Sequence, residues 1–183
     1  MNKTRLENFT DAILAISMTL MVLGIVAPVG AGLADLWGLR YQFLVYGLSF
    51  FTVAIYWRNH HYIFAGERKI SDGVLRLNML LVFLLTLFPF ITAWVGVENN
   101  IFALVPELTF GTIMLLSNVC FTALDLAVAK SDGTKAIFSK NRSVVTIAVN
   151  LAALALCFIF PPAVLIGRAI ILAIWVVPPK RAL

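Results

Sequence analysis

The chain has 183 residues, of which 61% are hydrophobic and 13% are charged. Its mean hydropathy is +0.96, and soluble domains contain only about 45–50% apolar residues. A soluble globular protein is excluded, because a core of this size cannot bury so many apolar side chains. The formal charge of +5 does not indicate a nucleic-acid partner, since the basic residues lie in short segments beside apolar runs, where membrane topology accounts for them.

Apolar runs of about 17–25 residues, each long enough to cross a hydrocarbon core of about 30 Å as a helix, recur along the sequence. Charged residues, proline and glycine bound these runs. They predict six transmembrane helices, at residues 7–27, 36–58, 74–97, 102–129, 143–160 and 162–177. We therefore expect an all-α membrane protein in which residues 1–183 form a single six-helix domain.

Basic residues predict the orientation, because they remain on the cytoplasmic side of helical membrane proteins. Apart from Arg40 and Arg168, they lie before the first span, at the second and fourth connections and at the C-terminus. They are Lys3, Arg5, Arg58, Arg68, Lys69, Arg76, Lys130, Lys135, Lys140, Arg142, Lys180 and Arg181. Both termini are thus predicted to be cytoplasmic. Arg168 falls within the sixth span, where we expect its long side chain to reach the outer interface.

The first predicted helix carries ionisable residues only at its start. The helix dipole and free backbone N–H groups favour a carboxylate at the position of Asp11, and residues 12–27 carry no charge. Charges beside a membrane helix are costly unless they are paired or reach the interface, so Arg5 and Asp11 are candidate functional residues. Beyond them, one helical stripe contains Ile16, Thr19, Leu20, Leu23 and Ala27. Periodicity alone favours helix packing for this stripe, with pore lining as the alternative.

A second polar cluster follows the second span. It consists of Tyr56, Trp57, Arg58, Asn59, His60 and His61. The predicted topology places this cluster on the same side as Asp11, where a bond from Asp11 to a histidine or an arginine would clamp the first helix to the second. His60 and His61 lack the further ligands of a metal site, and no catalytic group of nucleophile, base and orienting residue is visible. We predict no metal, no cofactor and no enzymatic activity.

The run Arg5-Leu6-Glu7-Asn8-Phe9-Thr10-Asp11 resembles the Arg-x-x-x-Phe-Ser-Asp signature of the transmembrane protein 175 potassium channels, with Thr10 in place of serine. The resemblance continues through residues 12–23, and through Trp57, His60 and His61. It also includes Asn78 and residues 87–90, whereas the last three spans are similar only in hydropathy. It implies a potassium-permeable channel in which four copies surround a pore lined by their first helices. The Thr-Val-Gly-Tyr-Gly loop of ordinary potassium channels is absent from the sequence.

The resemblance also implies roles for individual residues. The hydrophobic constriction of the family corresponds to Ile16, Leu20 and Leu23, with Thr19 as a neighbouring hydroxyl, and such a ring can gate by dewetting. The other signature residues would form a structural lock that holds the first helix, namely Arg5, Phe9, Thr10, Asp11, Trp57, His60 and His61. A short chain with one repeat implies a homotetramer in a prokaryotic plasma membrane, conducting potassium and other monovalent cations passively.

The alternative is a secondary transporter or a proton-coupled carrier. Transporters contain broken helices or ionisable groups near the midplane of the membrane. The middle of the first predicted helix contains Ile, Ser, Met, Thr and Leu instead. The channel is therefore the favoured interpretation.

Overall fold

The computed structural model describes residues 2–66, 70–97 and 100–178, and over these residues it confirms the predicted all-α fold. The helices are α1 (Lys3–Leu23), α2 (Leu33–Gly38), α3 (Arg40–Phe64), α4 (Asp72–Thr86), α5 (Phe88–Gly96), α6 (Leu104–Asp132), α7 (Lys140–Cys157) and α8 (Ala163–Val176), with a short 3-10 helix at Asn100–Phe102. By length and composition, three described segments can cross a membrane, namely Lys3–Leu23, Asp72–Gly96 and Leu104–Asp132, and Ala163–Val176 is apolar but shorter.

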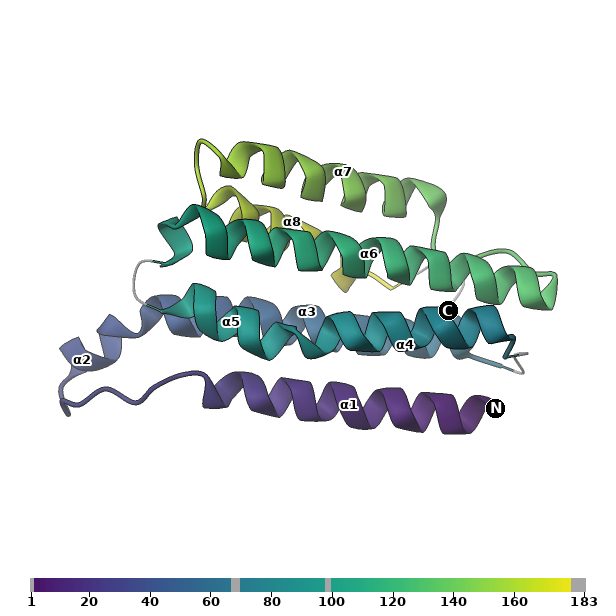
Figure 1. Ribbon diagram of the computed structural model, residues 1–183, viewed down its shortest axis with the longest axis horizontal. Helices are drawn as coiled ribbons and strands as arrows, with labels where there is room; N and C mark the ends of the chain where they lie inside the picture. Colours follow the sequence, from purple (N-terminus) through teal and green to yellow (C-terminus); the bar gives the residue numbers. More distant parts are fainter. Residues whose placement is uncertain (1, 67–69, 98–99, 179–183) are drawn as a thin grey trace.

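The long helices lie side by side in one bundle (Figure 1). Helix α1 lies at one edge and packs against α3, α4 and α5, while α7 lies at the opposite edge and packs against α6 and α8. Because α1 has neighbours on one side only, the bundle leaves one of its faces uncovered.

Several helix boundaries differ from the predicted spans. Helix α1 ends at Leu23 and not at residue 27, with Gly24 as its C-cap residue. Glycine has a low helix propensity, and here it also allows a close approach to α5, since a Cβ would lie 2.9 Å from the Cβ of Ala93. Helix α3 continues to Phe64, past the predicted end at residue 58. The charge of Arg58 was expected to end the span. The helix continues through this position because the guanidinium bonds to backbone carbonyls of α8.

The predicted third span is divided into α4 and α5. Helix α4 ends at Thr86, and Pro89 occupies the first turn of α5. Proline has no N–H to donate to the preceding turn, which interrupts the helical hydrogen-bond series. The first half of α1 contacts α4 and its second half contacts α5, so α1 lies across this interruption.

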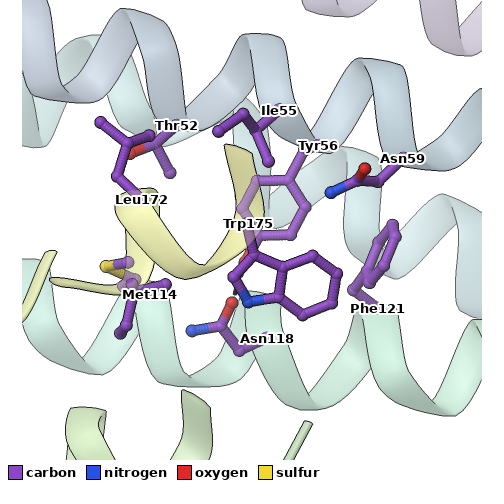
Figure 2. A pocket seen from close by; sticks show the side chains of 10 residues that line it. Thr52, Ile55, Tyr56, Asn59, Met114, Asn118, Phe121, Leu172 and Trp175 are labelled. Carbon is purple, nitrogen blue, oxygen red and sulfur yellow. Dashed lines mark hydrogen bonds between the residues drawn. The ribbon is translucent and has the colours of Figure 1, made fainter. Parts of the chain in front are cut away.

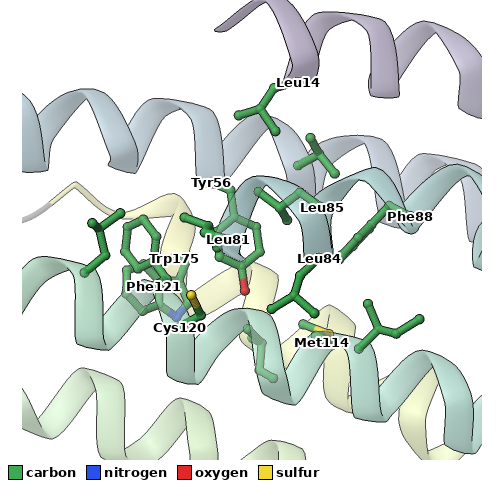
Figure 3. Close-up of a cluster of buried hydrophobic side chains, with 14 of the residues drawn as sticks. Leu14, Tyr56, Leu81, Leu84, Leu85, Phe88, Met114, Cys120, Phe121 and Trp175 are labelled. Carbon is green, nitrogen blue, oxygen red and sulfur yellow. The ribbon is translucent and has the colours of Figure 1, made fainter. Parts of the chain in front are cut away.

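The core lies between α3, α4, α5, α6 and α8, and the buried face of α1 contributes to it through residues such as Leu14 (Figure 3). Aromatic side chains from different helices meet edge to face in it, with ring centroids 5.6 Å apart for Phe88 and Phe110 and 5.5 Å apart for Tyr56 and Phe121. This geometry suits the aromatic quadrupole and adds about 0.5–1.5 kcal/mol per pair beyond the burial of area. The core therefore forms a rigid support for one side of α1.

Candidate functional site

Helix α1 has two contrasting faces. Its buried face repeats every three or four residues, at Leu6, Thr10, Leu14, Ser17 and Met21. On the opposite face, Ile16 is 57% exposed, Leu20 is 48% exposed and Leu23 is 75% exposed. The three residues of the predicted constriction therefore project away from the subunit.

A buried chain of hydrogen bonds joins α1 to α4 and α3 near the start of α1. The Thr10 hydroxyl accepts from Asn78 Nδ2 at 3.0 Å and donates to the carbonyl of Leu6. Asn78 Oδ1 lies 2.8 Å from His60 Nε2, and because an amide oxygen only accepts, His60 donates this bond. Thr10, Asn78 and His60 are at most 2% exposed, so no water replaces these bonds if one partner is lost.

A second bond lies close by, where Trp57 Nε1 donates to Asp11 Oδ1 at 3.0 Å. The partner of Asp11 is therefore an indole, and not the histidine or arginine considered from the sequence. His60 turns inward to Asn78, and Arg58 turns toward α8. Asp11 is exposed, so its charge remains solvated and a neutral indole N–H is a sufficient partner. We call Thr10, Asp11, Trp57, His60 and Asn78 the α1 anchor.

Three further residues of the predicted structural lock are not joined to the α1 anchor in the single subunit. Arg5, Phe9 and His61 are exposed, and their side chains form no hydrogen bond or ion pair among the described residues. Arg5 and Phe9 lie on the same face of α1 as Ile16, at helical spacing. Their contribution to the lock stays a prediction. Asn78 entered the sequence analysis only through the family resemblance, although a lone amide in an apolar span is a signal that could have identified its role.

Thr19 lies beside the constriction residues on the exposed face. Its hydroxyl donates to the carbonyls of Ile16 at 2.8 Å and of Ala15 at 3.2 Å. The bonds to its own helix satisfy the donor, while the hydroxyl oxygen keeps lone pairs. Thr19 can therefore present an acceptor to a cation or to water.

The prediction for Arg168 is wrong, because its side chain does not reach an interface. Arg168 is 1% exposed, and its guanidinium carbon lies 3.7 Å from the centroid of the Phe110 ring. It lies on the buried face of α8, where the aromatic face attracts the cation. Glu107 of α6 is fully buried nearby, and the opposite charges act on each other. Among the described residues, neither side chain has a hydrogen-bond partner.

Sequence reasoning missed Glu107, although a carboxylate within the predicted span 102–129, which contains Glu107 and Asp125, is a recognisable signal. Groups of three or more potential metal ligands are absent from the described part of the chain.

The fold and the α1 anchor thus define a helical membrane protein in which one edge helix is fixed at its base and uncovered along an apolar face.

Comparisons with known proteins identify the family. A family model described as endosomal/lysosomal potassium channel TMEM175 matches residues 5–89. A potassium channel of Chryseobacterium sp. (strain P1-3) is 34% identical over 99% of this chain and 96% of its own. A potassium channel of Streptomyces collinus is 28% identical over 66% of this chain and 61% of its own.

A crystal structure of a lysosomal potassium-selective channel TMEM175 homolog from Chamaesiphon minutus matches with a TM-score of 0.81. It is 26% identical and covers 94% of this chain and 95% of its own. The chain belongs to the TMEM175 potassium channel family, as the resemblance predicted, and it is not an enzyme. The residues matched by the family model include the whole α1 anchor.

Proposed function

We propose that this chain is one subunit of a homotetrameric potassium channel in which four α1 helices line a central pore. Potassium and other monovalent cations cross it passively. Residues 1–183 form a single channel domain with six spans, in which α4 and α5 together make the third. Membership of the TMEM175 family and the names of the relatives support this proposal.

The uncovered face of α1 is the observation that carries the proposal. Besides Ile16, Leu20 and Leu23, this face exposes the small residues Ala12 and Ala15. Small residues allow membrane helices to approach one another closely. A face that combines small and apolar side chains suits close assembly of α1 with copies of itself around an axis.

The constriction follows from this arrangement. Ile16 and Leu20 are one turn apart, and Ile16 and Leu23 are separated by about 10 Å along the helix. In the tetramer, each of them forms an apolar ring that excludes a hydrated ion when narrow and admits water when wider. Thr19 adds hydroxyl oxygens between these rings.

The basic residues support cytoplasmic termini. Those at the end of the bundle where α1, α4 and α7 begin are Lys3, Arg5, Arg58, Arg76, Lys130, Lys135, Lys140 and Arg142. We call this the basic end. The others predicted on this side, Arg68, Lys69, Lys180 and Arg181, lie outside the described residues. The distribution of charge favours a cytoplasmic position for the basic end in a prokaryotic plasma membrane.

A secondary transporter or proton-coupled carrier is the second candidate. The observation that favours it is the buried pair of Glu107 and Arg168, since ionisable groups inside a membrane protein often mark a transport path. The pair lies in α6 and α8, whereas α1 packs against α3, α4 and α5. A carrier would therefore use a path separate from α1.

Potassium flux into proteoliposomes tests the pore assignment with the variant Ile16→Asn. An amide in the ring lowers the cost of wetting, and we expect flux to rise about tenfold, equivalent to about 1.4 kcal/mol of barrier, with weaker preference for potassium over sodium. The matched control is Ile166→Asn on α8, because Ile166 is 51% exposed and Ile16 is 57% exposed.

Unchanged flux in Ile16→Asn, or an equal change in Ile166→Asn, would show that α1 does not line the pore. Flux strictly coupled to the gradient of another solute would favour the carrier. The oligomeric state in detergent is a further check, because a stable monomer contains no central pore.

A further inference from the structure

A cavity lies between α3, α6 and α8, away from α1 (Figure 2). It is partly open to the surface and encloses space for only about one water molecule, and side chains such as Ile55, Met114 and Leu172 line it. The polar groups of its wall are partly satisfied already, since the Tyr56 hydroxyl donates to Asn118 Oδ1. A mostly apolar wall between membrane helices suits a hydrocarbon chain better than a polar ligand.

Two arginines converge at one end of this cavity, where α8 ends. Arg58 of α3 donates from Nη1 to the carbonyl of Val176 at 2.9 Å and from Nη2 to the carbonyl of Trp175. Arg142 of α7 donates from Nη2 to the carbonyl of Val177. The last carbonyls of a helix lack partners within it and carry partial negative charge. The two guanidinium groups therefore cap α8 and tie it to α3 and α7.

The carbonyls do not neutralise the two guanidinium groups. Each carbonyl bears only a partial charge, and among the described residues neither arginine forms an ion pair with a carboxylate. Arg58 and Arg142 lie close enough for their like charges to act on each other. The end of α8 thus keeps an excess of positive charge, and both arginines are only partly buried.

Two residues that line the cavity also contact Arg58 or Arg142. The Trp175 ring lines the cavity, and the guanidinium carbon of Arg142 lies 4.6 Å from its centroid. Asn59 also lines the cavity, and its Oδ1 accepts from Arg58 Nη2 at 3.4 Å. A ligand that joins an anion to a hydrocarbon chain matches both parts. Phosphates prefer guanidinium partners, and basic sites between helices at the cytoplasmic surface suit anionic lipid head groups.

We propose that an anionic phospholipid binds at this end of the bundle, with its phosphate on Arg58 and Arg142 and one acyl chain lying along the open side of the cavity between α3, α6 and α8. The bound lipid offsets the repulsion between the two arginines and covers the apolar surface beside Trp175. The site requires only that the chain is embedded in a membrane, and it does not depend on potassium conduction.

Retention of lipid by the full-length protein tests this site. The protein is reconstituted in phosphatidylcholine vesicles with or without phosphatidylglycerol and extracted in mild detergent, and the bound lipids are counted by native mass spectrometry. We expect phosphatidylglycerol to be retained in preference to phosphatidylcholine. Arg142→Gln should lower its retention about tenfold, in line with the loss of one charge-assisted hydrogen bond. Lys140→Gln, at an exposed position of the same helix, should not lower it.

A second variant separates binding from folding. Leu172→Trp changes the shape of the apolar surface at the cavity and leaves both arginines in place, so it should also lower retention about tenfold if the acyl chain lies along the open side of the cavity. Equal retention by Arg142→Gln and Lys140→Gln would overturn the proposal, and so would full retention by Leu172→Trp. Displacement of the lipid by soluble sn-glycerol 3-phosphate would also overturn it, because the site would then recognise phosphate without a lipid chain.

Discussion

Replacing Thr10 with valine removes one acceptor from the α1 anchor at almost constant shape. Asn78 Nδ2 loses its partner at a position where both residues are fully buried. Hydrogen bonds between membrane helices contribute about 0.6 kcal/mol on average and up to about 1.7 kcal/mol. Because this one is fully buried, we expect Thr10→Val to lower the free energy of unfolding by about 1 kcal/mol, a factor of about five in the equilibrium constant.

Equilibrium unfolding in mixed micelles measures this change, followed by helical circular dichroism. Thr19→Val is the matched control, since the Thr19 hydroxyl bonds only to its own helix, and we expect a change near zero. A double-mutant cycle of Thr10→Val with Asn78→Leu should give a coupling energy of about 1 kcal/mol. A coupling energy of zero would refute the reasoning, because the two residues would then contribute independently.

Other substitutions test neighbouring contacts. Trp57→Phe should destabilise the protein by about 1 kcal/mol in the same assay and by much less when Asp11 is already alanine; equal costs would show that the indole acts through packing alone. Gly167→Ala should cost about 1–3 kcal/mol, because its Cβ would lie 2.8 Å from a Cβ of α7, and an unchanged melting temperature would contradict that close contact. Arg168→Met should cost about 3 kcal/mol by leaving a buried carboxylate uncompensated, and adding Glu107→Gln should restore part of this loss; no restoration would show that the two charges do not interact.

The sequence predicts the long helices well because apolar runs bounded by charge report directly on membrane burial. It predicts their ends less well, because these depend on contacts between segments. Gly24, where α1 ends, lies against Ala93 of α5, and Arg58 does not end α3 because α8 supplies carbonyls for its guanidinium. Such partners lie more than sixty residues away in the chain, so local patterns do not reveal them.

Only part of the candidate site was predicted, because its residues come from different helices that meet only in the fold. The signature contains Thr10, Asp11, Trp57 and His60, whose side chains form hydrogen bonds between helices, but it did not predict which residues meet. The direction in which each side chain of α3 points decides that Trp57 reaches Asp11 while His60 reaches Asn78. Exposure of Ile16 on α1 agrees with the predicted stripe, whereas its place in a pore involves other copies of the chain.

The hydrogen bonds of α1 to its neighbours are distributed unevenly. The hydrogen bonds of Thr10 and Asp11 lie near its start. Toward its other end, the Thr92 hydroxyl lies 3.8 Å from the sulfur of Met21, which is a weak acceptor. If α1 rotates in the proposed channel, the α1 anchor is therefore the expected pivot, and the helix beyond it acts as a lever. From Asp11 to Leu23 the lever arm is about 18 Å long, so a tilt of about 5° displaces Leu23 by about 1.6 Å. In the proposed tetramer, this small rotation would change the width of the proposed Leu23 ring by about 3 Å, close to the diameter of a water molecule.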